Sequence, residues 1–173
     1  MSSEPEFYPR VFAAYTTKRV EFRFRGLDLR FSLSHGLFSS ADIDSGSRLL
    51  LKVVSRLMDD DLRAGRELPK TMLDAGSGVG VLGVAVARGM EAAGIRDFRV
   101  RAQDRDELAR VFSARNALEN GLAPGSFGAF AEKLLDGPAD ARYGLILSNL
   151  PAKAGLPVLE DFFYRAARML APG

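Results

Sequence analysis

Residues 74–80 read Asp74-Ala75-Gly76-Ser77-Gly78-Val79-Gly80, and this glycine-rich stretch is the clearest structural signal in the chain. A short apolar run, Thr71–Asp74, comes before it, and an apolar helical pattern, Val79–Ala93, follows it and ends near Gly94. Glycine lets a backbone turn sharply and approach a ligand closely, and the first turn of a helix offers unpaired N–H groups. The stretch therefore predicts a strand, a ligand-binding turn and a helix in succession.

Downstream of the glycines, short apolar runs alternate with helical patterns. Strict alternation of strands and helices implies right-handed crossovers and a parallel sheet with helices on both faces, so we expect an α/β fold. The expected strands are Phe98–Gln103, Ser126–Phe130 and Tyr143–Leu147, and the expected helices are Asp106–Asn120 and Leu156–Leu170. The last helix carries its apolar residues on one side, which we expect to be buried: Leu159, Phe162, Phe163, Ala166 and Leu170.

Upstream, two runs of alternating apolar and charged residues, Val20–Phe24 and Leu27–Leu33, flank Gly26 and predict a β-hairpin with one buried face. A helix is expected over Arg48–Ala64, with Ser47 as a candidate cap. Its apolar residues recur at helical spacing: Leu49, Leu50, Val53, Val54, Leu57 and Met58.

The composition fits one globular domain, since 47% of the 173 residues are hydrophobic and 27% are charged. The chain has no cysteine and one histidine, His35, which excludes disulfides, thiolate zinc sites and multi-histidine sites, so we expect no metal. Residues 1–9 lack the layout of a signal peptide, and no apolar run approaches the roughly 18 residues that span a bilayer. We therefore expect a cytoplasmic protein that does not contact a membrane.

A net charge of +2 does not by itself indicate a nucleic-acid partner, but the hairpin is locally basic. Arg23, Arg25 and Arg30 fall mainly on its polar side, where they could bind RNA phosphates. A solvated outer face is the alternative, and the sequence leaves both interpretations open.

The chain ends on Leu170-Ala171-Pro172-Gly173, a turn that in such folds precedes another central strand. Four parallel strands would remain, with the apolar Tyr143–Leu147 strand at an edge of the sheet. An exposed edge of this kind promotes unwanted pairing. We therefore expect either a truncated chain that lacks C-terminal strands, or an edge covered by the hairpin or by another subunit in a homo-oligomer.

Asp74 helps to identify the ligand of the glycine turn. The spacing Gly78-x-Gly80-x-x-Gly83 also satisfies a dinucleotide pattern, which alone is a weak signal. A carboxylate before the first glycine would repel a pyrophosphate, but it suits a ligand with an ammonium group, such as the amino acid part of a methionine derivative. A turn that only packs a helix against a strand is the alternative.

Asp104 and Asn149 follow other strands at the same edge of the expected sheet. An acid at the place of Asp104 accepts hydrogen bonds from ribose hydroxyls, although Asp104-x-x-Glu107 also fits a helix-capping box, with Asp106 as a further cap. The Asn149 side-chain oxygen and the Leu150 carbonyl could accept two hydrogen bonds from an attacking amino group and orient it for in-line transfer. The alternative is an ordinary turn, made rigid by Pro151.

These residues together resemble class I S-adenosylmethionine-dependent methyltransferases of Rossmann-like fold. The resemblance rests on Asp74–Gly80, Asp104 and Ser148–Pro151. The segments Gly36–Ser39 and Ile43–Leu50 narrow it to the "small domain" group, which includes ribosomal RNA guanine-N2 methyltransferases. It covers the chain from about Phe22 to the C-terminus.

The resemblance implies S-adenosylmethionine as cofactor, with the glycine turn on its methionine part, Asp104 on its ribose and Phe130–Glu132 beside its adenine. It also implies one domain in two parts, a hairpin with a site-covering loop (1–47) and a cofactor-binding core (48–173). The acceptor would be oriented by Asn149, Leu150 and Pro151. The implied cofactor-binding residues are Asp44, Gly46, Asp74, Ala75, Gly76, Ser77, Gly78, Gly80, Asp104, Arg105, Ala131, Glu132 and Asn149.

The chain departs from the family pattern after Asn149. That pattern is Asn-Pro-Pro followed by an aromatic residue, and this chain has Leu150 and Ala152 instead. The aromatic residue would stack on a base, a contact worth roughly 1–3 kcal/mol. We expect methyl transfer to a nitrogen of a base in structured RNA. The alternatives are a small-molecule or protein acceptor, a non-catalytic domain that binds cofactor or RNA, and a nicotinamide oxidoreductase.

Overall fold

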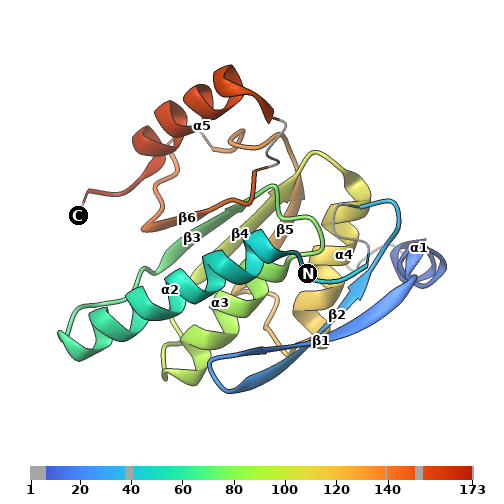
Figure 1. Ribbon diagram of the computed structural model, residues 1–173, viewed down its shortest axis with the longest axis horizontal. Helices are drawn as coiled ribbons and strands as arrows, with labels where there is room; N and C mark the ends of the chain where they lie inside the picture. The colour runs from blue at the N-terminus through green and yellow to red at the C-terminus, as the bar shows by residue number, and fades with distance from the viewer. Residues whose placement is uncertain (1–6, 38–40, 139, 151–153, 173) are drawn as a thin grey trace.

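The computed structural model describes residues 7–37, 41–138, 140–150 and 154–172 (Figure 1). In chain order the elements are α1 (Phe7–Tyr15), β1 (Lys18–Phe24), β2 (Leu27–Leu33), α2 (Ser45–Arg63), β3 (Thr71–Ala75), α3 (Val81–Ala92), β4 (Arg99–Asp104), α4 (Glu107–Glu119), β5 (Phe127–Ala131), β6 (Leu145–Leu147) and α5 (Leu156–Met169). None of the helices in these residues is long and apolar enough to cross a membrane.

The central sheet has four parallel strands in the order β5-β4-β3-β6, which confirms the predicted α/β fold. Asp74 in β3 pairs with Ala102 in β4 on one side and with Leu147 in β6 on the other. Because the strands are parallel, the turns that follow β3, β4, β5 and β6 meet at one edge of the sheet.

Two hydrophobic cores lie on opposite faces of β3, because successive side chains of a strand alternate between faces. Met72 belongs to the larger core, which α2, α3, α4 and the hairpin complete. Leu73 and Ala75 belong to the smaller core, where they pack with Phe162 and Ala166 of α5. Figure 1 shows α5 and α2 on the two sides of the sheet.

The hairpin forms its own antiparallel sheet, in which Val20 lies opposite Phe31. It contacts α3 and α4, far from the edge strand β6 in Figure 1. The expectation that the hairpin covers the β6 edge is therefore wrong, because the apolar face of β2 is used against these helices. Asn116 of α4 fixes it there, since its Nδ2 donates to the Ser32 carbonyl (3.1 Å) and its Oδ1 accepts from the Ser32 N–H (2.9 Å).

The N-terminal helix α1 was not expected from the sequence. Its Phe12 is buried, and the Phe12 ring lies 4.8 Å from the ring of Phe112 in α4. The helix therefore extends the larger core.

Helix α2 begins at Ser45, three residues earlier than expected, and its N-cap is Asp44 rather than Ser47. The Asp44 carboxylate accepts the Ser47 N–H at 3.0 Å, as N-cap side chains do. The expected apolar face is only partly buried. Leu51, Val54 and Met58 face the core. A second apolar row is exposed, with Leu49 at 63%, Val53 at 45% and Leu57 at 54%.

Helix α5 is also only partly buried. Phe162 and Ala166 pack on the sheet, as expected, but Phe163 is 67% exposed and Leu170, just after the helix, is 45% exposed. Two of its expected buried residues thus face outward. The reason is that α5 meets the smaller core through Phe162 and Ala166, so side chains at the other positions of the helix point away from it.

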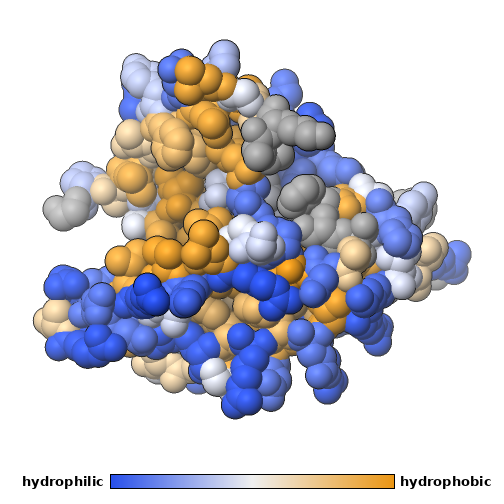
Figure 2. Space-filling view, in the orientation of Figure 1, coloured by the Kyte–Doolittle hydropathy of each residue, from blue (hydrophilic) through white to orange (hydrophobic). Residues whose placement is uncertain are grey.

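The free edge of the sheet lies between these two helices. Tyr143, just before β6, forms a parallel bridge with Leu170, in which the Tyr143 N–H donates to the Met169 carbonyl (2.9 Å) and the Ala171 N–H to the Tyr143 carbonyl (2.8 Å). Within the described residues, β6 itself pairs only with β3. Figure 2 shows apolar side chains gathered over α2 and α5 on either side of this edge.

Candidate functional site

The turn after β3 has the backbone that its glycines predict. Gly76, Gly78 and Gly80 have φ angles of +73°, +52° and +87°, in the left-handed region that favours glycine. Gly80 also needs to be small, since a Cβ there would lie 2.8 Å from Oγ of Ser113 in α4. The turn is tied to β4 because the N–H groups of Gly76 and Ser77 both donate to the Gln103 carbonyl, at 2.8 and 3.0 Å.

Asp104, at the end of β4, braces the same turn. Its Oδ2 accepts the Gly78 N–H at 3.0 Å, and its Oδ1 accepts the Asp106 N–H at 3.1 Å. The N-cap of α4 is Asp106, whose side chain accepts the Leu108 N–H at 2.9 Å. The expectation that Asp106 caps this helix is thus confirmed. The contact of Asp104 with a ribose stays a prediction.

Asp74 lies behind the glycines and is only 1% exposed. Its Oδ2 accepts the Gly83 N–H of α3 at 2.8 Å, but its Oδ1 has no hydrogen-bond partner among the described residues. Burial raises the pKa of Asp74 to about 7; the Gly83 hydrogen bond opposes this rise, and the nearby charge of Asp104 adds to it. A cation that reached Oδ1 would satisfy this oxygen and favour the charged form.

Asn149, in the turn after β6, is held by the turn that begins α2. Its Nδ2 donates to Oδ1 of Asp44 at 2.8 Å and to Oγ of Ser47 at 3.2 Å, and that hydroxyl donates to Oδ2 of Asp44 at 2.7 Å. Gly46 leaves room for the amide, since a Cβ there would lie 2.7 Å from Oδ1 of Asn149. The structure therefore brings together Asp44, Gly46 and Asn149, three of the residues implied by the resemblance.

Sequence reasoning did not give Ser47 this second role. Its hydroxyl was expected only as a helix cap, and the pattern Asp44-x-x-Ser47 before an apolar helix was the available signal.

The segment after β5 is arranged differently from expectation. The Glu132 carboxylate is bound by Arg101, whose Nη2 lies 2.6 Å from both carboxylate oxygens. The Arg101 guanidinium also lies 3.7 Å from the centre of the Phe130 ring. The Glu132 side chain is thus occupied by its ion pair with Arg101 on the face of the sheet. Ala131 is exposed at the edge. A cofactor contact of Ala131 and Glu132 would use their main chain.

The remaining expected site residues lie as follows. Ala75 is fully buried, and its carbonyl accepts the hydroxyl of Ser148 at 2.7 Å. Leu150 packs against the smaller core, and Arg105 is exposed. Pro151 and Phe38–Ser40 of the covering loop lie outside the described residues.

The basic hairpin face is smaller than expected. Arg25 is not on the polar side: its side chain is 17% exposed, and its Nη1 bonds to Asp59 at 2.7 Å and to the Ser55 carbonyl at 2.9 Å. Its left-handed backbone in the hairpin turn points it toward α2 instead. Arg23 and Arg30 are exposed, and each faces an acid across the hairpin.

Comparison with known proteins assigns the chain to a family. A family model described as "Methyltransferase small domain" matches residues 28–173. The chain is 36% identical over 129 residues to a ribosomal protein L11 methyltransferase of Pelotomaculum thermopropionicum, covering 75% of this chain and 37% of the relative. It is 28% identical over 154 residues to a ribosomal RNA small subunit methyltransferase C of Actinobacillus pleuropneumoniae, covering 87% of this chain and 42% of the relative.

Among solved structures, the fold is similar to that of the T. thermophilus 16S rRNA N2 G1207 methyltransferase (RsmC) in complex with AdoMet and guanosine. The TM-score is 0.73 at 24% identity, over 90% of this chain and 40% of that one. The chain thus spans about 40% of the length of each of these three proteins.

Proposed function

Because the chain belongs to the methyltransferase small domain family, we propose that it transfers a methyl group from S-adenosylmethionine to a nitrogen of a base in structured RNA. The family supports the reaction type and the cofactor. The similarity to a ribosomal RNA methyltransferase supports RNA as the acceptor. Family membership also argues against the nicotinamide alternative that the glycine spacing allows.

The cofactor side rests on the unpartnered oxygen of Asp74. This atom is buried beside the glycine turn, and no described residue donates a hydrogen bond to it. The ammonium group of the methionine part is a cation that would do so. Asp104 keeps the Gly78 end of the turn in place, and its half-buried carboxylate can accept a further hydrogen bond from a ribose hydroxyl.

The observation that carries the proposal on the acceptor side is the orientation of the Asn149 amide. Its Nδ2 donates to the Asp44 carboxylate and the Ser47 hydroxyl, so Oδ1 is the atom left to contact a substrate. An amide oxygen accepts hydrogen bonds and cannot donate them. The site therefore suits an acceptor that carries N–H groups, such as the exocyclic amine of a base.

The chemistry follows from this orientation. Bound S-adenosylmethionine supplies an electrophilic sulfonium methyl, and transfer forms a carbon–nitrogen bond as the carbon–sulfur bond breaks. Asn149 Oδ1 accepts one N–H of the amine and the Leu150 carbonyl accepts the other, which directs the nitrogen lone pair toward the methyl group. The methylated nitrogen then loses its extra proton to solvent, so the chain needs no strong base.

The test supplies labelled S-adenosylmethionine with cellular RNA, protein or small-molecule fractions. Label is expected in RNA, and Asn149→Ala should abolish transfer while S-adenosylhomocysteine still binds in calorimetry. Ser148→Ala is the matched control, because it removes a neighbouring hydroxyl whose hydrogen bond among the described residues goes to the Ala75 carbonyl; transfer should stay within a few-fold of the unchanged protein. Unchanged transfer in Asn149→Ala would remove this residue from the mechanism.

The runner-up is a protein or small-molecule acceptor, which the loss of the family aromatic at Ala152 favours. Label in either of those fractions would establish it. Cofactor binding without transfer to any fraction would instead identify a non-catalytic domain.

A further inference from the structure

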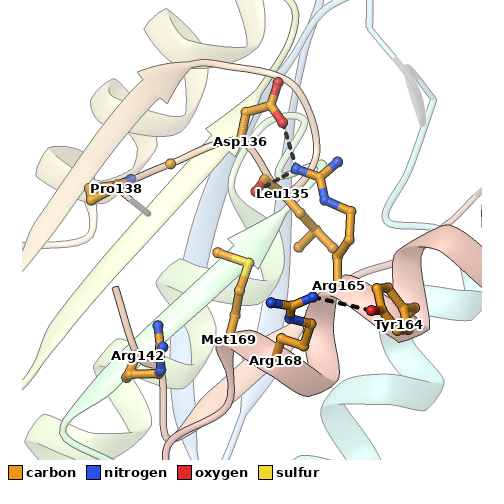
Figure 3. A pocket seen from close by; sticks show the side chains of 9 residues that line it. Leu135, Asp136, Pro138, Arg142, Tyr164, Arg165, Arg168 and Met169 are labelled. Atoms are coloured by element: carbon orange, nitrogen blue, oxygen red, sulfur yellow. Dashed lines mark hydrogen bonds and ion pairs between the residues drawn. The ribbon is translucent and has the colours of Figure 1, made fainter. Parts of the chain in front are cut away.

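A cavity of about 510 Å³ lies between the segment after β5 and the C-terminal half of α5, and its described lining contains none of the residues expected at the site (Figure 3). Leu135 and Met169 give it an apolar part. Among the described residues, three arginines and one acid line it, Arg142, Arg165 and Arg168 against Asp136. The cavity therefore carries a net positive charge.

Arg165 forms one wall of the cavity. Its Nη2 donates to Oδ1 of Asp136 at 2.7 Å and to the Leu135 carbonyl at 3.1 Å. Arg165 thus ties the segment after β5 to α5, and its charge is offset by Asp136 and by Asp161, whose Oδ2 lies 3.7 Å from Nη1.

Arg142 and Arg168 differ from Arg165, because neither forms an ion pair with a carboxylate among the described residues. Nη1 of Arg142 donates to the Ala141 carbonyl at 2.9 Å, and Nη1 of Arg168 donates to the Tyr164 hydroxyl at 3.1 Å. A guanidinium has five N–H donors, so each of these arginines keeps most of its donors for a ligand. Paired guanidinium donors match the oxygens of a phosphate.

Tyr164 adds an aromatic surface beside these charges. It is 63% exposed, and the Arg168 guanidinium lies 5.6 Å from the centre of its ring. Positive charge next to exposed aromatic rings is the combination with which proteins bind single-stranded nucleic acid, since the charges contact the backbone and the rings stack on bases.

We propose that this cavity binds single-stranded RNA, with a phosphate held by Arg142 and Arg168 and a neighbouring base stacked on Tyr164. The inference rests on the proposed function in taking RNA as the partner, and it adds a second contact remote from the Asn149 turn. An acidic peptide could use the arginines but would leave the tyrosine ring unused.

The test measures fluorescence anisotropy of a labelled single-stranded RNA 12-mer over a series of salt concentrations. The double variant Arg142→Gln/Arg168→Gln should bind about tenfold more weakly, and its salt dependence should fall by roughly 0.7 in log–log slope, the value for one phosphate. Tyr164→Leu should also weaken binding by roughly tenfold, but with the slope unchanged, because stacking carries no charge.

The matched control is Arg23→Gln/Arg30→Gln, which removes the same charge from the exposed hairpin. Little weakening in this control supports the cavity. Equal or greater weakening overturns the proposal, because it shows that net charge or the hairpin governs binding. Displacement of the RNA by a poly-glutamate peptide at equal charge concentration also overturns it.

Calorimetry with S-adenosylhomocysteine separates this proposal from the proposed function. The cavity variants should bind that ligand as the unchanged protein does. If they do, and RNA binding is also unchanged, the cavity proposal fails while the methyltransferase proposal stands. If the unchanged protein binds RNA through the cavity but transfers no methyl group, the proposed function fails alone.

Discussion

The glycine turn after β3 and the Asn149 turn after β6 stand at the same edge of the sheet, yet different interactions hold them. Main-chain hydrogen bonds to Gln103 and close contact with α4 fix the glycine turn, and the side chains of Asp104 and Asn116 add hydrogen bonds to it. The Asn149 turn depends on side-chain hydrogen bonds to Asp44 and Ser47. The proposed cofactor side is thus built by the fold itself, whereas the acceptor side depends on a few polar atoms that substitution can change without disturbing the fold.

The largest effect is expected for Gly80→Ala, which disturbs the packing of the glycine turn against α4. The φ angle of +87° and a Cβ 2.8 Å from Ser113 Oγ should together cost about 3 kcal/mol of unfolding free energy and abolish cofactor binding. Urea denaturation and calorimetry measure both. Gly78→Ala is the control, because its φ is +52° and no atom lies within 4 Å of the added Cβ, so about 1 kcal/mol is expected. Equal losses in the two variants would contradict this account.

Gly46→Ala tests the Asn149 turn, which side-chain hydrogen bonds hold in place. Its Cβ would meet Asn149 Oδ1 at 2.7 Å and push the amide from its place on Asp44. The rate of methyl transfer should fall by as much as about 100-fold, since a displacement near 1 Å can cost that much, while the free energy of unfolding changes little. Ser45→Ala, at the neighbouring exposed position, should leave the rate unchanged. A Gly46→Ala variant with normal turnover would show that the amide orientation is not required.

Asp74 predicts a pH dependence of cofactor binding. Its pKa is about 7 in the folded protein without ligand, and an ammonium group favours the ionised form, so binding must displace a proton below pH 7. The affinity for S-adenosylhomocysteine should therefore fall by about tenfold for each pH unit below 7 and level off above it. Calorimetry at several pH values measures this slope.

The raised pKa of Asp74 has the opposite effect on the stability of the protein without ligand, which should fall as pH rises. Because the pKa of Asp74 is raised above its unfolded value of 3.8, the folded state binds the extra proton between about pH 4 and 7, and stability falls as pH rises through this window. Asp74→Asn should remove this contribution and weaken cofactor binding at pH 8. A ligand affinity that does not change between pH 5.5 and 8 would count against an ionised Asp74 in the complex.

The smallest effect is expected at the exposed row of α2. Leu57→Glu should change the free energy of unfolding by no more than about 0.5 kcal/mol, because the side chain is 54% exposed. Leu51→Ala, on the buried side of the same helix, should cost about 2–5 kcal/mol.

Sedimentation of Leu57→Glu at increasing concentration also tests whether a second copy covers the β6 edge, since added charge should then reduce self-association.

Local patterns predicted the strand, turn and helix around Asp74 because the chemistry there is contiguous in sequence. The parallel direction of the strands was predicted from their alternation with helices, although the described residues contain no helix between β5 and β6. The Asp44–Asn149 contact joins residues 105 positions apart, so only the folded chain reveals that the amide oxygen is the free atom. The Arg101–Glu132 pair was missed for a similar reason, because it depends on the register between β4 and β5.

Periodicity gave the wrong buried face for part of α2. Leu49, Val53 and Leu57 form a regular row, and a single sequence does not reveal which of two adjacent apolar rows meets the core. The same ambiguity affected Phe163 in α5.

Asn116 links the hairpin to the glycine turn. Besides holding Ser32 of the hairpin, its Nδ2 donates to the carbonyl of Val79 in the glycine turn, at 2.8 Å. Its amide is fully buried, so the Ser32 N–H that it accepts should be among the slowest to exchange with deuterated solvent. A ligand that orders the glycine turn should then slow exchange in β2 as well, and Asn116→Ala should uncouple the two. The hairpin would thus report on occupancy of a site that it does not touch.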